Sequence, residues 1–268
     1  MQSWDLQHKI QVTTTRIIEW YEYYNGQVYV AFSGGKDSTV LLDIVRRIYP
    51  DVPAVFADTG LEFPEVRQFA MSCENVVVVR PEMNFRKVIE TYGYPVVSKR
   101  VADVVEYGRK PGSTRWKLLH GEVMRSNGTP SEFNCKKWCY LLNAPFKVSS
   151  RCCNVMKKQP MKKYAKQTKR YPIIATMAEE SRNRRTVWLK HGCNAFSGKK
   201  PSSTPMSFWT ENDVLEYLYT YNIPYASVYG DIVRTTGGGG ALQESSVQAV
   251  CFAPLVLIWK RLQIAFSD

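Results

Sequence analysis

The segment SGGKDST stands out in this chain as suited to binding chemistry. It consists of Ser33, Gly34, Gly35, Lys36, Asp37, Ser38 and Thr39. It follows an apolar run and precedes a segment of helical periodicity, so free backbone N–H groups and the positive end of a helix dipole should meet there. The glycines allow close approach of a phosphate, Lys36 supplies a cation, and two hydroxyl groups supply donors. The spacing is not that of a Walker loop. The segment therefore predicts another kind of anion site, and a plain glycine turn is the alternative.

Two adjacent cysteines, Cys152 and Cys153, form a second group of reactive residues. The chain has 7 cysteines, an odd number, which favours reduced thiols, metal ligands or redox groups over a disulfide framework. Adjacent cysteines do not readily form a disulfide with each other, but two thiolates can bind one metal cluster when a second pair comes from elsewhere. Cys135 and Cys139 are either further ligands or ordinary thiols, and both interpretations stay open.

The elements that must position these residues alternate between strand and helix. Periodic apolar residues from Leu6 to Tyr24 predict an amphipathic helix. The later segments predicted as strands are 27–32, 53–57, 75–79 and 171–176, and those predicted as helices are 38–48, 63–72 and one that begins near Thr210. This alternation predicts an α/β fold, a parallel twisted sheet with helices on both faces. Ligands of such sheets bind at the carboxyl ends of the strands, where the loops at Ser33 and Asp58 lie.

Composition narrows the class of protein. The chain has 268 residues and is 44% hydrophobic, which excludes a largely disordered or low-complexity protein. Its formal charge of +12 favours polyanionic partners such as nucleotides or nucleic acids, with a merely basic surface as the alternative. The sequence MQSWDLQHKI lacks the apolar core of a signal peptide, and the apolar run Val250–Trp259 is too short to span a bilayer. We therefore expect a cytoplasmic protein without membrane contact.

Several segments resemble, in order, the phosphoadenosine phosphosulfate (PAPS) reductase family of the PP-loop superfamily. SGGKDST resembles the pyrophosphate loop, and Asp58-Thr59-Gly60 begins a segment similar to the family's DTG…FPE sequence. The other similar segments are CC…K..P at 152–160, ES..R at 180–184 and P…W…D…Y…NIPY at 205–225. The resemblance runs from about Gly26 to Val233.

The resemblance implies a Rossmann-like fold of the adenine nucleotide alpha hydrolase type, with a helix at 1–25 and the PP-loop domain at 26–233. It also implies a bound adenine nucleotide: PAPS, adenosine 5'-phosphosulfate (APS), or ATP with magnesium. The nucleotide-binding residues expected besides the loop at 33–39 are Asp58, Thr59, Gly60, Glu180, Ser181, Arg182 and Arg185. Arginines, with Arg184 among them, suit bidentate pairing to phosphate or sulfate, although a solvated cationic stretch is the alternative.

Residues 234–268 do not fit the resemblance. In the family's cluster-containing branch, a later CxxC completes the CC pair to hold a four-iron, four-sulfur cluster, and here Cys152 and Cys153 supply only half. When the reading frame is shifted by one nucleotide, the codons from Ala241 onward are compatible with the peptide TTGVERTGCMFCAFGAHLEKTPNRFQR. This peptide resembles the cluster-binding terminus of the family, which the chain otherwise lacks. We hypothesise that one nucleotide was lost or skipped near the codons for Arg234 to Gly240, with a divergent genuine tail as the alternative.

Three functions remain after the sequence is considered. The first is a PAPS reductase-family enzyme of sulfur metabolism that binds an adenylylated sulfate or related adenine nucleotide. Relatives reduce it with a nucleophilic cysteine on a carboxyl-terminal tail, which this chain lacks in either frame, so no catalytic residue is identified. The second is an ATP pyrophosphatase that adenylates an acceptor during sulfur insertion into nucleic acid. The third is a non-catalytic protein that binds nucleotide or nucleic acid, the latter through the basic segment Lys157–Arg170 with its Tyr164. Oligomeric state stays open.

Overall fold

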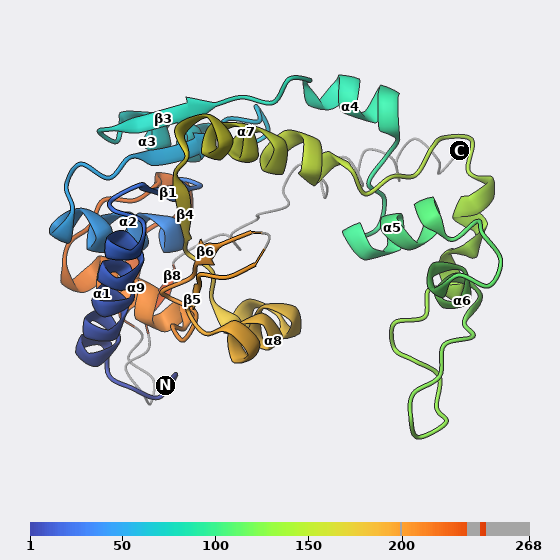
Figure 1. Ribbon diagram of the computed structural model, residues 1–268. Helices are drawn as coiled ribbons and strands as arrows, with labels where there is room; N and C mark the ends of the chain where they lie inside the picture. The colour runs from blue at the N-terminus through green and yellow to red at the C-terminus, as the bar shows by residue number, and fades with distance from the viewer. Residues whose placement is uncertain (199, 235–241, 245–268) are drawn as a thin grey trace. The chain divides into compact units, whose positions relative to one another are not determined.

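The computed structural model describes residues 1–198, 200–234 and 242–244, which form two compact units (Figure 1). The first unit contains Met1–Asp58, Glu62–Arg80 and the described residues from Met161 onward. The second contains Thr59–Leu61 and Pro81–Pro160. Each unit has its own buried apolar residues.

A six-stranded sheet is the centre of the first unit, with the strand order β3-β2-β1-β4-β6-β5. The strands are β1 (Val28–Phe32), β2 (Ala54–Ala57), β3 (Val76–Val79), β4 (Tyr171–Ile174), β5 (Asn194–Ala195) and β6 (Ser202–Ser203). All neighbours pair in parallel except β5 and β6, which pair antiparallel. Four of the five residues of β1 are buried, because a central parallel strand is covered on both faces. The predicted α/β fold is confirmed.

Helices cover both faces of this sheet. The helices α1 (Leu6–Tyr23), α2 (Lys36–Ile48) and α9 (Glu211–Thr220) pack against one another on one side of β1 and β4, and α7 (Gln159–Thr168) lies on the other (Figure 1). The main apolar core lies under the first group and includes the fully buried Trp20 and Trp209. On the opposite face, the Tyr29 ring meets the Tyr164 ring edge-on with centroids 5.3 Å apart. The first unit also contains α3 (Pro64–Ser72) and α8 (Arg182–His191), with short 3-10 helices at Ala178–Glu180 and Ser227–Tyr229.

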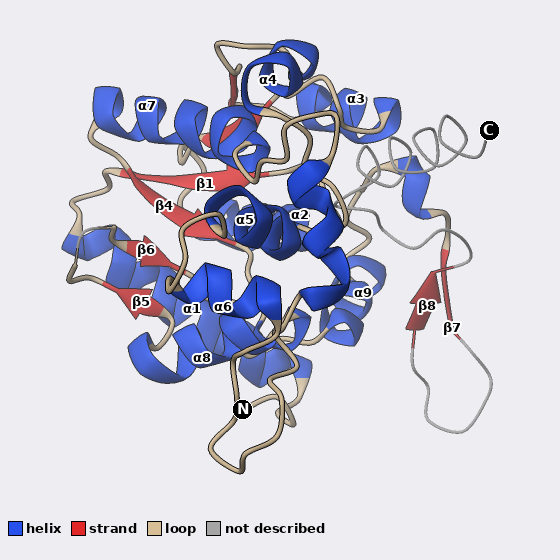
Figure 2. Cartoon of the chain, turned by 90° about the vertical axis from the view of Figure 1, so that its right-hand side faces the viewer, coloured by secondary structure: helices blue, strands red, loops and turns tan. Residues whose placement is uncertain are grey.

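The second unit is helical. Its elements are α4 (Phe85–Tyr92), α5 (Lys99–Tyr107), α6 (Thr114–His120), a 3-10 helix at Lys136–Asn143 and a π-helical turn at Asn154–Lys158 that leads into α7 (Figure 2). Side chains of Asn84, Ser98 and Ser113 cap the first three helices. A cluster that includes Val104, Leu119 and Leu141 joins α5, α6 and the 3-10 helix.

The tail is described only in part. The strand β7 (Ile232–Arg234) pairs antiparallel with β8 (Leu242–Glu244). The reading-frame hypothesis for residues from Ala241 onward otherwise falls outside the described residues and stays a prediction. Among the described helices, none is long and apolar enough to cross a bilayer.

Candidate functional site

The loop between β1 and α2 contains the predicted anion-binding segment. Gly34 has a φ of +73°, a conformation that side chains disfavour. A Cβ atom at Gly34 would also lie 2.9 Å from the Val66 carbonyl oxygen and 3.2 Å from the Ala70 Cβ of α3. Both the turn and the close approach of α3 therefore require glycine at this position.

The first turn of α2 follows a glycine. Its N-cap residue is Gly35, which has no side chain to cap the helix, and the Gly35 N–H donates to the Ser33 hydroxyl oxygen at 3.3 Å. By contrast, the N-terminus of α1 is capped by Asp5, that of α8 by Ser181 and that of α9 by Thr210. The first N–H groups of a helix have no acceptor within the helix and, together with the dipole, favour an anion. The start of α2 therefore has the geometry of an anion site.

Hydrogen bonds from serine and threonine hydroxyl groups stabilise the backbone of the loop at 33–39. The Ser38 and Thr39 hydroxyl groups donate to the Gly35 carbonyl oxygen at 2.9 and 3.0 Å. The Ser33 N–H donates to the Ser38 hydroxyl oxygen at 3.2 Å. These bonds fix the backbone, and a direct contact of Ser38 or Thr39 with a ligand stays a prediction.

Lys36 is buried at the start of α2 and has an acidic partner. Its ammonium lies 3.2 Å from the Glu211 carboxylate at the start of α9, and 5.2 Å from the centroid of the Tyr229 ring. The Glu211 carboxylate itself is 65% exposed, so it remains accessible to solvent. The cation of the loop is thus present, held by a carboxylate that a bound anion would have to share or displace.

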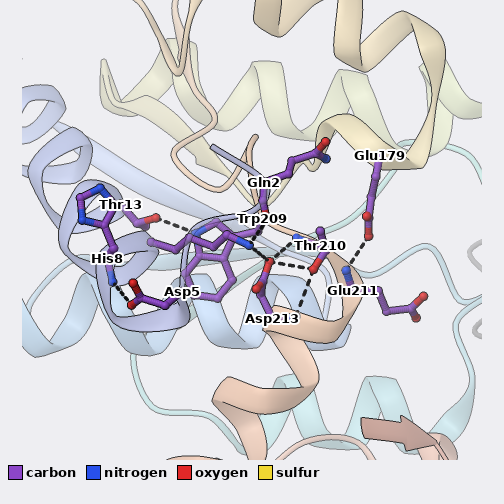
Figure 3. A network of polar contacts seen from close by, with 10 residues as sticks. Gln2, Asp5, His8, Thr13, Glu179, Trp209, Thr210, Glu211 and Asp213 are labelled. Carbon is purple, nitrogen blue, oxygen red and sulfur yellow. Dashed lines mark hydrogen bonds and ion pairs between the residues drawn. The ribbon is translucent and has the colours of Figure 1, made fainter. Parts of the chain in front are cut away.

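A hydrogen-bond network fixes the start of α9, and with it Glu211 (Figure 3). The Asp213 Oδ2 atom accepts from the Thr210 N–H at 2.6 Å and from the Thr210 hydroxyl at 2.8 Å. The same oxygen accepts from the buried Lys9 ammonium at 2.6 Å. The Glu211 N–H donates to the Glu179 carboxylate at 2.5 Å. The starts of α2 and α9 and the residues before α8 are therefore held together.

Asp37, the second residue of α2, has a perturbed carboxyl group. Burial raises its pKa, and Glu211 and Glu179 raise it further, against the lowering effect of Lys36 and Arg184. These electrostatic interactions indicate that the predicted loop and the predicted segment around Glu180 lie near each other. The Asp37 carboxyl group therefore holds its proton more tightly than a solvent-exposed carboxyl group does.

The segment from Glu180 to Arg185 places its charged groups at the start of α8. Glu180 accepts from the Met177 N–H at 3.0 Å and forms an ion pair with Arg184. The Ser181 hydroxyl oxygen caps α8 by accepting from the Arg184 N–H at 3.2 Å. Arg182 and Arg185 are exposed. Contact of Glu180, Ser181, Arg182 and Arg185 with a nucleotide stays a prediction.

The second predicted loop is divided between the two units. Asp58, at the end of β2, is buried and accepts from Arg67 at 3.0 and 3.1 Å and from Arg80 at 3.3 Å. Thr59 and Gly60 follow in the chain but belong to the second unit, where the Thr59 hydroxyl oxygen accepts from the Leu61 N–H at 3.2 Å. The arginine pair holds Asp58 at the strand end, and nucleotide binding by these residues stays a prediction.

Cys152 and Cys153 lie in the second unit, in an apolar cluster with Val88, Val155 and Met156. A hydrogen bond from the Cys152 thiol, aided by nearby lysines, lowers the pKa of Cys153 to about 6 against the opposing effect of burial. The same hydrogen bond and burial raise the pKa of Cys152.

The described cysteines do not assemble a complete metal site. Within the described ranges, no group of three or more His, Cys, Asp or Glu residues is arranged to hold a metal ion. Cys135 is buried in the α5–α6 cluster, where the Arg100 guanidinium lies 3.6 Å from its sulfur. A role for Cys152 and Cys153 as two of the four thiolates of a four-iron, four-sulfur cluster therefore stays a prediction.

Several residues at this site were not found from the sequence. No residue pattern in the sequence singles out Lys9, Arg67, Glu211 or Tyr229 for this site. Lys9 lies on an amphipathic helix where a lysine normally faces solvent. Its burial depends on Asp213, which lies 204 positions later in the sequence.

Comparison with known proteins adds independent information. A sequence model described as the phosphoadenosine phosphosulfate reductase domain matches residues 27–105 and 126–240. An uncharacterized protein of Methanocaldococcus jannaschii is 27% identical over 213 residues, which cover 78% of this chain and 35% of that protein. An adenosine 5'-phosphosulfate reductase of Geobacillus thermodenitrificans is 24% identical over 212 residues, 78% of this chain and 70% of that protein. A sulfate adenylyltransferase subunit 2 of Aliivibrio fischeri is 24% identical over 205 residues, 74% of this chain and 58% of that protein. This chain thus spans about a third of the length of the archaeal relative.

Proposed function

The chain belongs to the phosphoadenosine phosphosulfate reductase domain family, and from this premise we propose that its first unit binds an adenylylated sulfate or a closely related adenine nucleotide. The phosphate or sulfate group would bind at the loop Ser33–Thr39. The observation that carries this proposal is the start of α2, where the N-cap residue is glycine and the first helical residue is a buried lysine. Backbone N–H groups and a fixed cation together favour a dianionic group.

Each part of the loop has a distinct role in this proposal. Gly34 gives the turn its shape and lets α3 approach, so that the N–H groups of the first turn converge. Lys36 supplies positive charge from a buried position, where less of its attraction is screened by water. Glu211 neutralises this charge while the site is empty, which limits the cost of a buried cation.

The relatives' names narrow the substrate class. One relative is named an adenosine 5'-phosphosulfate reductase and another a sulfate adenylyltransferase subunit. An adenylyl group and sulfate are common to both names. We therefore place APS and PAPS first among the substrates to be tested, with ATP next.

Reduction is not assigned to any described residue. It requires an electron donor and a thiolate that attacks sulfur. Under the reading-frame hypothesis, Cys152 and Cys153 would bind an iron–sulfur cluster together with the two cysteines of a restored CxxC. Iron and sulfide analysis of the chain as written and of the chain with the restored frame tests this. A stoichiometric cluster on the chain as written would contradict the hypothesis.

A second candidate function is adenylation of an acceptor with release of pyrophosphate from ATP and magnesium. Similarity to a sulfate adenylyltransferase subunit favours it, because that name specifies adenylyl transfer. Magnesium would neutralise the triphosphate beside Asp37 and Glu211, and no coordination is assigned to either carboxylate.

Product analysis separates these functions. The full chain is incubated with APS or PAPS and a dithiol, or with ATP, magnesium and either nucleic acid or sulfate as the acceptor, and the adenine products are separated by chromatography. Sulfite released together with AMP or adenosine bisphosphate supports the reductase. Pyrophosphate released from ATP supports the second candidate. Saturable binding without product in any arm supports a non-catalytic nucleotide-binding protein, and absence of binding in every arm contradicts the proposal.

A further inference from the structure

Most of the net positive charge of the chain lies in residues 81–160 of the second unit. Residues 81–160 contain 15 Lys and Arg against 6 Asp and Glu, a net charge of +9 out of +12 for the whole chain. The anion loop in the first unit does not account for this charge. A surface of such density attracts an extended polyanion.

Aromatic side chains stand exposed among these cations. Tyr140 is 63% exposed and Phe133 is 50% exposed, although large apolar side chains are normally covered. Trp138, on the same 3-10 helix as Tyr140, has the Lys137 ammonium 5.1 Å from its ring centroid. Exposed rings beside cations are the combination that holds unpaired nucleic acid bases and their phosphates.

Other rings of this unit are also paired with arginine. The Arg100 guanidinium lies 5.0 Å from the Phe133 ring centroid, and the Arg115 guanidinium lies 5.2 Å from that of Tyr107. A planar guanidinium held over a ring offers a further surface on which a base can stack.

The segments that present these side chains are anchored to a packed core. The Cys135 N–H donates to the Leu118 carbonyl oxygen at 2.8 Å, and the Arg109 guanidinium donates to the Leu142 carbonyl oxygen at 3.0 Å. Leu119 and Leu141 are buried beneath them. Rings held on a fixed frame lose little conformational freedom when a ligand stacks on them.

Part of this surface also lies outside the family match. The sequence model matches residues 27–105 and resumes at 126, so it omits the end of α5, all of α6 and the following turn. Lys110, Arg115 and Lys117 lie in the omitted stretch. Phe133, Lys136, Lys137 and Tyr140, by contrast, lie within the matched residues.

We propose that exposed side chains of the second unit, among them Tyr107, Arg115, Phe133, Lys136, Lys137 and Tyr140, bind single-stranded nucleic acid. Phosphates pair with the lysines and arginines, and bases stack on the exposed rings. An acidic peptide would use the cations and leave the rings unused. The proposal goes beyond adenine-nucleotide binding by the loop at Ser33–Thr39 and does not depend on it.

This location differs from the basic segment predicted for nucleic acid, Lys157–Arg170. In the structure that segment forms the π-helical turn and α7, and Tyr164 packs against Tyr29 of the sheet. Its ring is therefore partly covered, and nucleic acid binding by that segment stays a prediction. The exposed lysines of α7, including Lys162 and Lys166, give a matched set for comparison.

The test measures binding of the full chain to labelled oligouridylate of about 12 nucleotides by fluorescence anisotropy over a range of salt concentrations. Binding is described by the slope of the logarithm of the association constant against the logarithm of the salt concentration. The double variant Lys136→Gln/Lys137→Gln should lower the magnitude of this slope by about 1.4, since each lost phosphate contact contributes about 0.7 for a single strand. The control Lys162→Gln/Lys166→Gln has the same charge change and should leave the slope unchanged. Equal effects of the two double variants would overturn the proposal.

Stacking is tested separately with Tyr140. Tyr140→Ala should weaken binding about fivefold or more, while Tyr140→Phe, which keeps the ring, should bind like the original chain. Oligodeoxythymidylate and duplex competitors distinguish the form of nucleic acid recognised. Absence of binding at low salt, tighter binding of duplex than of single strand, or equal competition by poly-glutamate would each overturn the proposal. Normal adenine-nucleotide binding by the same preparation separates this outcome from failure of the proposed function.

Discussion

The Glu211 carboxylate lies 3.2 Å from the Lys36 ammonium, although 175 positions separate the two residues in the sequence. This contact joins the starts of α2 and α9, so the cation of the anion loop already has an anionic partner. A bound phosphate or sulfate would therefore compete with a carboxylate that is mostly exposed and readily solvated.

Neutralising Glu211 should strengthen anion binding. Glu211→Gln removes the negative charge 3.2 Å from the Lys36 ammonium, and affinity for AMP should rise about fivefold when no divalent cation is present. Calorimetric titration measures this affinity. Glu216→Gln, on the same helix and with the same charge change, should bind like the original chain. Weaker binding in Glu211→Gln would contradict competition between the carboxylate and the anion.

Asp37 should make stability depend on pH. Because its pKa is raised in the folded protein, the unfolded chain loses this proton more readily, and ionisation destabilises the fold as pH rises above the ordinary value of 3.8. Asp37→Asn should therefore unfold at a higher temperature than the original chain at neutral pH. The difference should shrink as pH falls toward and below 3.8. Thermal unfolding across this range measures it, and an unchanged difference at all pH values would exclude ionisation as the cause.

Gly34 and Gly60 have the same φ of +73°. Comparing their alanine variants therefore separates the cost of the backbone conformation from the cost of steric crowding. A Cβ at Gly34 meets the Val66 backbone, whereas one at Gly60 meets no described atom within 4 Å. Gly60→Ala should cost about 1 kcal/mol of unfolding free energy, the conformational part alone. Gly34→Ala should cost about 2 to 5 kcal/mol, since crowding adds to it. Urea denaturation compares the two variants, and equal losses would remove the case for close approach of α3.

The buried pair of Lys9 and Asp213 should matter for stability. Lys9→Met leaves the Asp213 carboxylate buried without its cation, and we expect a loss of about 3 to 5 kcal/mol in unfolding free energy. Lys9→Met/Asp213→Asn removes the stranded charge while the amide oxygen can still accept from Thr210, so its loss should be smaller. Chemical denaturation of both variants tests this order. A double variant as unstable as the single one would show that the charge itself is not the cause.

The strands and the anion loop could be predicted from sequence because their signals are local. The run from Gln27 to Phe32 became β1 at Val28–Phe32, and the predicted helix after the loop became α2. Buried β-branched runs and a glycine turn before a periodic segment need no distant information.

Contacts between distant segments could not be predicted in this way. The spacing of residues along the sequence predicts neither the burial of Lys9 nor the contact between Glu211 and Lys36. Tyr164 lies in a basic stretch that suggested nucleic acid, but the fold uses its ring to cover Tyr29. The division of the segment at Asp58 and Thr59 between two units likewise depends on tertiary packing.

The most direct test of nucleotide binding at the loop is calorimetric titration of APS into the original chain, Lys36→Met and the control Lys87→Met. Lys87 is an exposed lysine of α4, so its variant matches the charge change away from the loop. The account predicts saturable binding to the original chain and to Lys87→Met, and binding about 10 to 100 times weaker to Lys36→Met, since a hydrogen bond to a charged group is lost. Unchanged thermal unfolding would show that Lys36→Met is folded. Equal affinity of a folded Lys36→Met, or no binding of APS to the original chain, would contradict the account.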